Sequence, residues 1–269
     1  MGKRTQYPTS NTLKNLITRR LLAALALVIG TGLLVILTDF QLTDTLTKSH
    51  LYAQESIISF PLSISPLAKP HPLPSTLSQW QDKTNSGDYF SQVTTTKEGY
   101  LVWSQFPVRV YVETPKAVNN KQAEAWINRV LQAVQEWSNY LPLIIVEQPE
   151  VADITILRKA PPLQISRGDK IPRARSAQTT YELYVSNQVL SHRFTIFLSP
   201  SQTGEYLQAA ARHELGHALG IWGHSPLQTD ALYFSQVRNP PPISPRDVNT
   251  LKRVYEQPTS LGWLVIKRK

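Results

Sequence analysis

Two repeating patterns of apolar residues alternate along the chain after about residue 96. Short runs rich in β-branched and aromatic residues predict strands at 109–113, 143–147, 153–158, 180–185 and 192–199. Apolar residues spaced three and four apart predict amphipathic helices at 123–137, 201–219 and 244–255. A strand, a helix and two strands, followed by a hairpin across 186–191, predict an α+β fold with helices packed on a mixed sheet.

The two later helices also carry local signals. In the helix at 201–219, an apolar stripe formed by Leu207, Ala211, Leu215 and Ala218 is expected to face the sheet. The last helix is expected to begin at Ser244 as N-cap, with Pro245 in the first turn and Asp247 completing a capping box.

The longest apolar run lies near the N-terminus, at residues 21–37, and directly follows Arg19 and Arg20. Its 17 residues exceed the signal-peptide core of about 7 to 15 and are at the short end for a spanning helix. We expect a signal-anchor, with the basic residues 1–20 in the cytoplasm and the rest of the chain on the periplasmic or other extracytoplasmic side. A cleaved signal peptide and secretion are the alternative. A core helix is disfavoured because the segment has no polar face.

Residues 38–95 are interpreted as a spacer rich in Ser, Thr and Pro. Its prolines, which favour extended backbone, include Pro61, Pro66, Pro70, Pro72 and Pro74. An inhibitory propeptide is the alternative, although the chain has no cysteine to place on a metal. The folded domain is then expected to cover 96–258, and the basic tail 259–269 is read as a short strand or a surface anchor.

The charge pattern argues against a nucleic-acid partner. The net charge of +9 is concentrated at the termini, where eight basic residues leave 20 basic against 19 acidic residues elsewhere. The body of the protein is therefore nearly neutral and has no basic stripe with interleaved aromatic residues. Because the chain has no cysteine, any metal must be bound by His, Asp or Glu.

Three of the six histidines lie within "RHELGHALGIWGHS", residues 212–225. His213 and His217 are four apart on one helix face, so both imidazoles can bind one ion. Gly220 follows the last helical turn, where it can end the helix and let His224 return as a third ligand. Three neutral imidazoles leave a zinc ion an open position for water, and Glu214 is placed to act as general base and then general acid.

The spacing His-Glu-x-x-His-x-x-Gly-x-x-His resembles the zinc signature of the metzincin metallopeptidases, and Ser225 after it resembles the matrixin branch. The resemblance implies a membrane-tethered zinc endopeptidase with one catalytic zinc and a protein or peptide substrate. It also implies a turn beneath the zinc, where Leu232 stands in the place of the family's methionine and Tyr233 follows as a packed aromatic or a transition-state contact. Residues 239–244 would then form part of a pocket rim.

Several expectations follow from this resemblance. The strand 192–199 is expected to be a sheet edge that pairs with substrate. Calcium is not predicted, because no loop rich in Gly and Asp is found, and His192 is expected to be structural rather than a second zinc ligand. Two other functions stay open: a catalytically inactive zinc-binding scaffold that recognises a partner, and a small-molecule amide hydrolase with a closed pocket.

Overall fold

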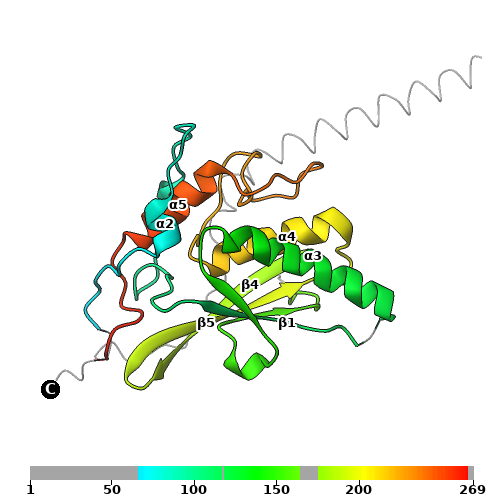
Figure 1. Cartoon of the computed structure of the whole chain (residues 1–269), viewed down its shortest axis with the longest axis horizontal. Helices are drawn as coiled ribbons and strands as arrows, with labels where there is room; N and C mark the ends of the chain where they lie inside the picture. Colours follow the sequence, from blue (N-terminus) through cyan, green and yellow to red (C-terminus); the bar gives the residue numbers. More distant parts are fainter. Residues whose placement is uncertain (1–65, 117, 164–174, 266–269) are drawn as a thin grey trace, which may run out of the picture. The chain divides into compact units, whose positions relative to one another are not determined.

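Five strands form one mixed sheet in the order β2-β1-β3-β5-β4 (Figure 1). β1, β2, β3 and β5 are parallel, whereas β4 pairs antiparallel with β5 as a hairpin. The strands are β1 (Val108–Val112), β2 (Leu143–Val146), β3 (Ile154–Leu157), β4 (Ala177–Ser186) and β5 (Val189–Leu198). The predicted strands and hairpin are therefore present, and the fold is mixed α and β, as expected.

Two helices lie side by side over one face of this sheet (Figure 1). They are α3 (Asn120–Ser138) and α4 (Gly204–Ala218). The predicted stripe of α4 is buried, including Leu207 and Leu215, and it contacts β4 and β5. Burying each such leucine stabilises the fold by about 1.5–3 kcal/mol. The helix that carries the histidine motif is thus fixed to the sheet through its opposite side.

A further helix, α5 (Pro245–Tyr255), begins with the predicted capping box. Ser244 Oγ accepts from the Asp247 amide, and the Asp247 carboxylate accepts from the Ser244 amide. The short helices are α2 (Ser75–Gln79), η2 (Phe90–Gln92) and η3 (Pro149–Val151).

The structure is a computed structural model that describes residues 66–116, 118–163 and 175–265, all within the compact unit Glu55–Lys269. The apolar run 21–37 lies outside the described residues. Within the described ranges, the structure contains no helix that is both long and apolar enough to span a membrane.

Residues 66–95 belong to the folded unit, which differs from the expected spacer. Leu77 is fully buried and Tyr89 is 2 % exposed. Val93 pairs with Gly223, just before the third histidine of the motif. These two buried side chains come after the last proline of the run, Pro74, and lie in helix α2 and directly before η2. Proline density alone therefore misplaced the start of the domain.

The strand order corrects a second expectation, because β5 is not an edge strand. It pairs with β3 on one side and β4 on the other, and the edges of the described sheet are β2 and β4. A hairpin pattern does not indicate which of its two strands faces outward. The alternation in β5, with Phe194, Ile196 and Leu198 buried, shows which face is covered but not which strands lie on either side.

Candidate metal centre

The three motif histidines meet at the C-terminal end of α4. One ring nitrogen from each of the three histidines can be chosen so that these three nitrogens lie within 4.8 Å of one another. The ring centroids of His213 and His217 are 4.7 Å apart, and that of His224 lies 5.2 and 4.8 Å from them. Among the described residues, this is the group of His, Asp and Glu side chains that could hold a metal ion. The structure thus brings together the three predicted ligands.

Two backbone carbonyls fix the tautomers of the helix histidines. His213 Nδ1 lies 2.9 Å from the Ala231 carbonyl oxygen, and His217 Nδ1 lies 2.7 Å from that of Ile221. Because a carbonyl only accepts, each Nδ1 carries a proton, which in the neutral imidazole leaves the lone pair on Nε2. Carbonyls in this position are the usual partners that orient metal-bound imidazoles.

The two Nε2 atoms then face each other at 3.1 Å. Two lone pairs at this distance repel unless a proton or a cation lies between them. Burial, and then the neighbouring charges of His213 and His224, lower the pKa of His217 well below its usual value, which disfavours the proton. The donor set therefore fits a shared cation bound through Nε2.

Gly220 produces the turn that completes the ligand set. Its φ is +134°, a region that side-chain-bearing residues rarely adopt. A Cβ atom there would lie 3.3 Å from both the Leu101 carbonyl oxygen and the Tyr255 ring. The turn brings the Ile221 carbonyl under His217 and directs the chain to His224. This is the role predicted for the glycine.

Glu214 is 7 % exposed and is held by the edge strand. The Thr179 hydroxyl of β4 donates to Glu214 Oε2 at 2.6 Å. Burial raises the pKa of the Glu214 carboxyl, while the charge of His213, the Thr179 hydrogen bond and Arg175 oppose that rise. Thr179 is a site residue that the sequence did not reveal, because a threonine in a strand carries no signal of a long-range contact.

Thr179→Val is expected to lower the free energy of unfolding by about 1–3 kcal/mol, because the valine keeps the shape of the side chain but removes the hydroxyl that donates to a buried carboxylate oxygen. The matched control is Thr180→Val, since the Thr180 hydroxyl donates instead to the Thr195 carbonyl. Denaturant unfolding compares the two variants. An equal loss of stability in both would contradict a specific role for the bond from Thr179 to Glu214.

Leu232 and Tyr233 follow the loop that carries the third histidine. Leu232 is fully buried, and its carbonyl accepts from the Ser225 amide at 2.8 Å. A Cβ atom added to Gly216 would lie only 2.6 Å from Leu232 Cδ2, so this leucine packs directly against α4. Tyr233 is partly buried and pairs with Ser225. That Leu232 forms a floor beneath a metal ion stays a prediction.

Two buried aspartates, Asp230 and Asp247, link this loop to α5. The sequence predicted that Asp247 caps α5, but it did not indicate the bonds to the loop. Asp247 accepts from the Ala231 amide at 2.9 Å besides capping α5. Asp230, 1 % exposed, accepts from the hydroxyls of Ser225 and Ser244. Through these bonds the N-terminus of α5 positions the carbonyl that orients His213.

His192 is buried in an aromatic cluster, as expected for a structural residue. Its ring stacks on Trp103 at 4.0 Å between centroids, and its Nε2 has no hydrogen-bond partner among the described residues. Burial lowers the pKa of His192 to about 3.

This histidine predicts an acid-sensitive fold. Below its ordinary pKa of 6.5 the unfolded chain takes a proton that the folded chain refuses until about pH 3. Stability should therefore fall by about 1.4 kcal/mol per pH unit over that window from this group alone. His192→Phe should flatten that part of the profile, as measured by denaturant unfolding from pH 7 to 4. An unchanged slope would contradict the assignment.

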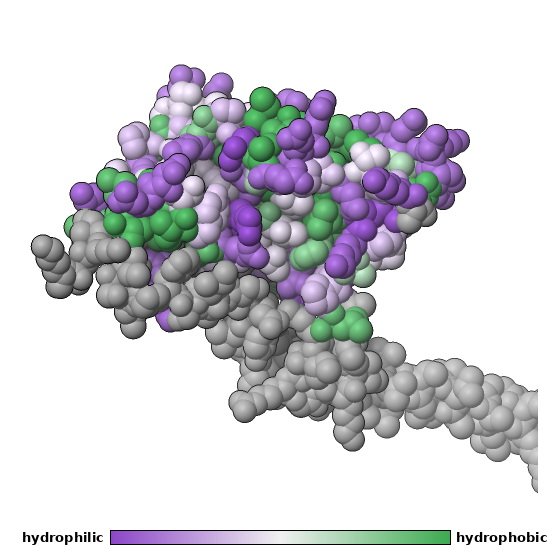
Figure 2. All heavy atoms as spheres, turned by 90° about the horizontal axis from the view of Figure 1, so that it is seen from below, coloured by the Kyte–Doolittle hydropathy of each residue, from purple (hydrophilic) through white to green (hydrophobic). Residues whose placement is uncertain are grey.

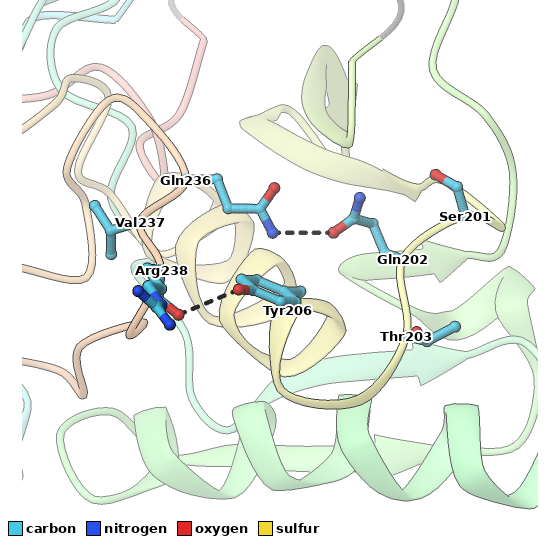
Figure 3. Close-up of a pocket in the computed structure, with 7 residues that line it drawn as sticks. All are labelled: Ser201, Gln202, Thr203, Tyr206, Gln236, Val237 and Arg238. Atoms are coloured by element: carbon cyan, nitrogen blue, oxygen red, sulfur yellow. Dashed lines mark hydrogen bonds between the residues drawn. The ribbon is translucent and has the colours of Figure 1, made fainter.

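An open hollow of about 430 Å³ lies at the other end of α4 (Figure 3). It is lined by Ser201, Gln202, Thr203, Tyr206, Gln236, Val237 and Arg238. Tyr206 is two helical turns before His213 and so lies on the same flank of α4. Its hydroxyl donates to the Arg238 carbonyl at 3.2 Å. The lining ends just before residues 239–244, the expected rim, and contains none of the three histidines.

Comparisons with protein-family models and with curated proteins found no match for this chain.

Proposed function

We propose that the protein is a zinc-dependent endopeptidase, with a metzincin-like fold of the matrixin type. The observation that carries the proposal is the convergence of three imidazoles beside a buried glutamate. One nitrogen from each imidazole lies within 4.8 Å of the others, and His213 Nε2 and His217 Nε2 are 3.1 Å apart. A zinc ion would be held by these three residues, since neutral imidazole nitrogens are among its usual ligands.

When bound, zinc would supply Lewis acidity and lower the pKa of a water molecule toward neutrality. His213, His217 and His224 would hold it. Glu214 takes a proton from the attacking water and returns it to the departing amine nitrogen. The hydrogen bond from the Thr179 hydroxyl would hold this carboxylate in place. A zinc site with a purely structural role has no use for such a carboxylate, which favours the enzyme over the inactive scaffold.

The position of β4 supports a polypeptide as substrate. Thr179 lies on this edge strand and contacts Glu214, so the strand runs past the proposed catalytic group. An extended peptide can add to a sheet edge by main-chain hydrogen bonds. Such a binding mode suits an endopeptidase better than a small-molecule amide hydrolase.

We also propose that residues 21–37 anchor the protein in a membrane with the catalytic domain on the extracytoplasmic side, as their length and the preceding arginines suggest.

The proposed function is tested with the full chain in detergent. The metal-free protein should bind one equivalent of zinc by calorimetry, and zinc should restore hydrolysis of casein after chelation. Zinc binding without hydrolysis of casein or of any peptide in a diverse mixture would favour the scaffold. Failure to bind zinc would refute the proposal.

A further inference from the structure

Exposed apolar side chains from three distant segments gather at one end of the fold. Leu67 is 69 % exposed, Leu264 is 61 % exposed and Val185, near the turn of the β4–β5 hairpin, is 42 % exposed. In Figure 1 the first and last described residues lie beside this hairpin. Figure 2 shows a group of hydrophobic residues at the same end of the molecule. We call Leu67, Val185, Trp263 and Leu264 the apolar end.

Backbone hydrogen bonds hold these segments together. The Leu190 amide donates to the Trp263 carbonyl at 3.1 Å, and the Val265 amide donates to the Gln188 carbonyl at 2.7 Å. The start of the expected C-terminal tail is thus joined to the start of β5 by an isolated β-bridge, Val189–Leu264. Lys69 and Thr259 exchange two further backbone bonds, which join the first described segment to the last.

Trp263 lies at the centre of this arrangement. Its indole NH donates to the Lys69 carbonyl at 3.2 Å, and its ring stacks on His71 at 4.3 Å between centroids. The Lys69 ammonium lies 5.9 Å from the same ring. The side chain is therefore fixed at the surface and only partly buried.

Lys69, which lies over the Trp263 ring, gives the apolar end a positive charge. In the sequence, three more basic residues follow shortly after the described residues: Lys267, Arg268 and Lys269. On the hairpin itself, Arg193 and Glu182 neutralise each other at 2.7 Å. Exposed aliphatic residues, a tryptophan and neighbouring lysine or arginine are the composition of surfaces that bind a bilayer interface, where apolar insertion and attraction to anionic lipids act together.

We infer that the apolar end rests on a membrane surface rich in anionic phospholipid. This inference rests on the proposed anchor. The chain enters the described domain at this end, where the Pro66 carbonyl accepts from the Ser260 hydroxyl. The 28 residues 38–65 separate it from the apolar run. Each of these residues spans at most about 3.6 Å, so the segment holds the domain within about 100 Å of the bilayer. This tether raises the effective concentration of the domain at the membrane surface, which favours even a weak contact.

Because the chain has no cysteine, a single introduced cysteine can carry a fluorophore at one chosen position. Ser186→Cys, at the hairpin turn, reports on the apolar end, and Ser201→Cys, just beyond the other end of β5, is the matched control. Both serines are exposed. The ten residues of β5 separate the two ends by about 33 Å. The full chain carrying a fluorophore at either cysteine is placed in nanodiscs of phosphatidylglycerol and phosphatidylcholine.

At position 186 the label should lose most of its quenching by aqueous acrylamide and gain quenching by doxyl-labelled lipid, while the label at 201 should stay open to acrylamide. Nanodiscs of phosphatidylcholine alone should weaken this protection. Leu67→Glu combined with Leu264→Glu should abolish it without altering the signal at position 201. These results together would support the inference.

Three results would overturn it. Equal acrylamide access at both positions in a chain that co-elutes with nanodiscs would leave the anchor intact but remove the surface contact. Protection at 186 that appears in detergent and rises with protein concentration would assign the apolar end to a second copy. A chain that does not enter nanodiscs would refute both the anchor and the contact, while leaving the zinc chemistry untouched.

Discussion

Under the proposed function, Glu214→Gln is expected to lower kcat/KM for peptide hydrolysis by about 10²–10⁴, the contribution of one positioned general acid–base group. Glutamine keeps the size of the side chain and can still accept the Thr179 hydrogen bond, but its amide cannot take a proton from water. Since Glu214 is not one of the three proposed ligands, zinc content and affinity should stay close to those of the wild type.

The matched control for this variant is Glu205→Gln, in the first turn of the same helix, where the side chain is exposed. It should keep full activity. Hydrolysis by Glu214→Gln at the rate of the control, with equal zinc bound, would show that Glu214 does not move the proton.

His224→Gln is expected to abolish the rise in Tm that zinc gives the wild type. At a free zinc concentration of 100 times Kd, that rise corresponds to about 2.7 kcal/mol of stability. Mutation of a residue that hydrogen-bonds to a metal ligand lowers metal affinity by about 10–100-fold, so removal of the ligand itself should lower the zinc affinity further. The side chain is exposed, and the Tm of the metal-free protein should therefore hardly change.

Thermal unfolding with and without zinc separates this outcome from simple damage to the fold. His217→Gln should lose the zinc response as well, but it should also destabilise the metal-free protein because His217 is buried. His71→Gln, outside the cluster, should retain the response. A normal zinc-dependent Tm rise in His224→Gln would remove that residue from the ligand set.

The elements of the fold were predictable where one local rule dominated. The stripe of α4, the capping box at Ser244 and the strand runs depend on near neighbours, and the structure has each of them. The ligand set was predictable for the same reason, since helix spacing and the turn at Gly220 determine where the three imidazoles project.

Long-range pairing was not predictable in this way. Sequence pattern did not decide which hairpin strand lies at the edge, and therefore did not place Thr179 beside Glu214. It also gave no sign that Asp230 joins the third histidine's loop to α5. The Pro-rich segment was misread because proline content describes backbone freedom, whereas burial of Leu77 and Tyr89 depends on surfaces formed elsewhere in the chain.

The central claim, hydrolysis of peptide bonds at the three-histidine site, is tested most directly by mass spectrometry of a peptide library incubated with the zinc-loaded full chain. Glu214→Gln with equal zinc serves as the blank. We predict internal cleavage products with the wild type that are absent from the blank and from the metal-free protein. A wild-type digest identical to the blank, with zinc bound in both, would contradict the claim.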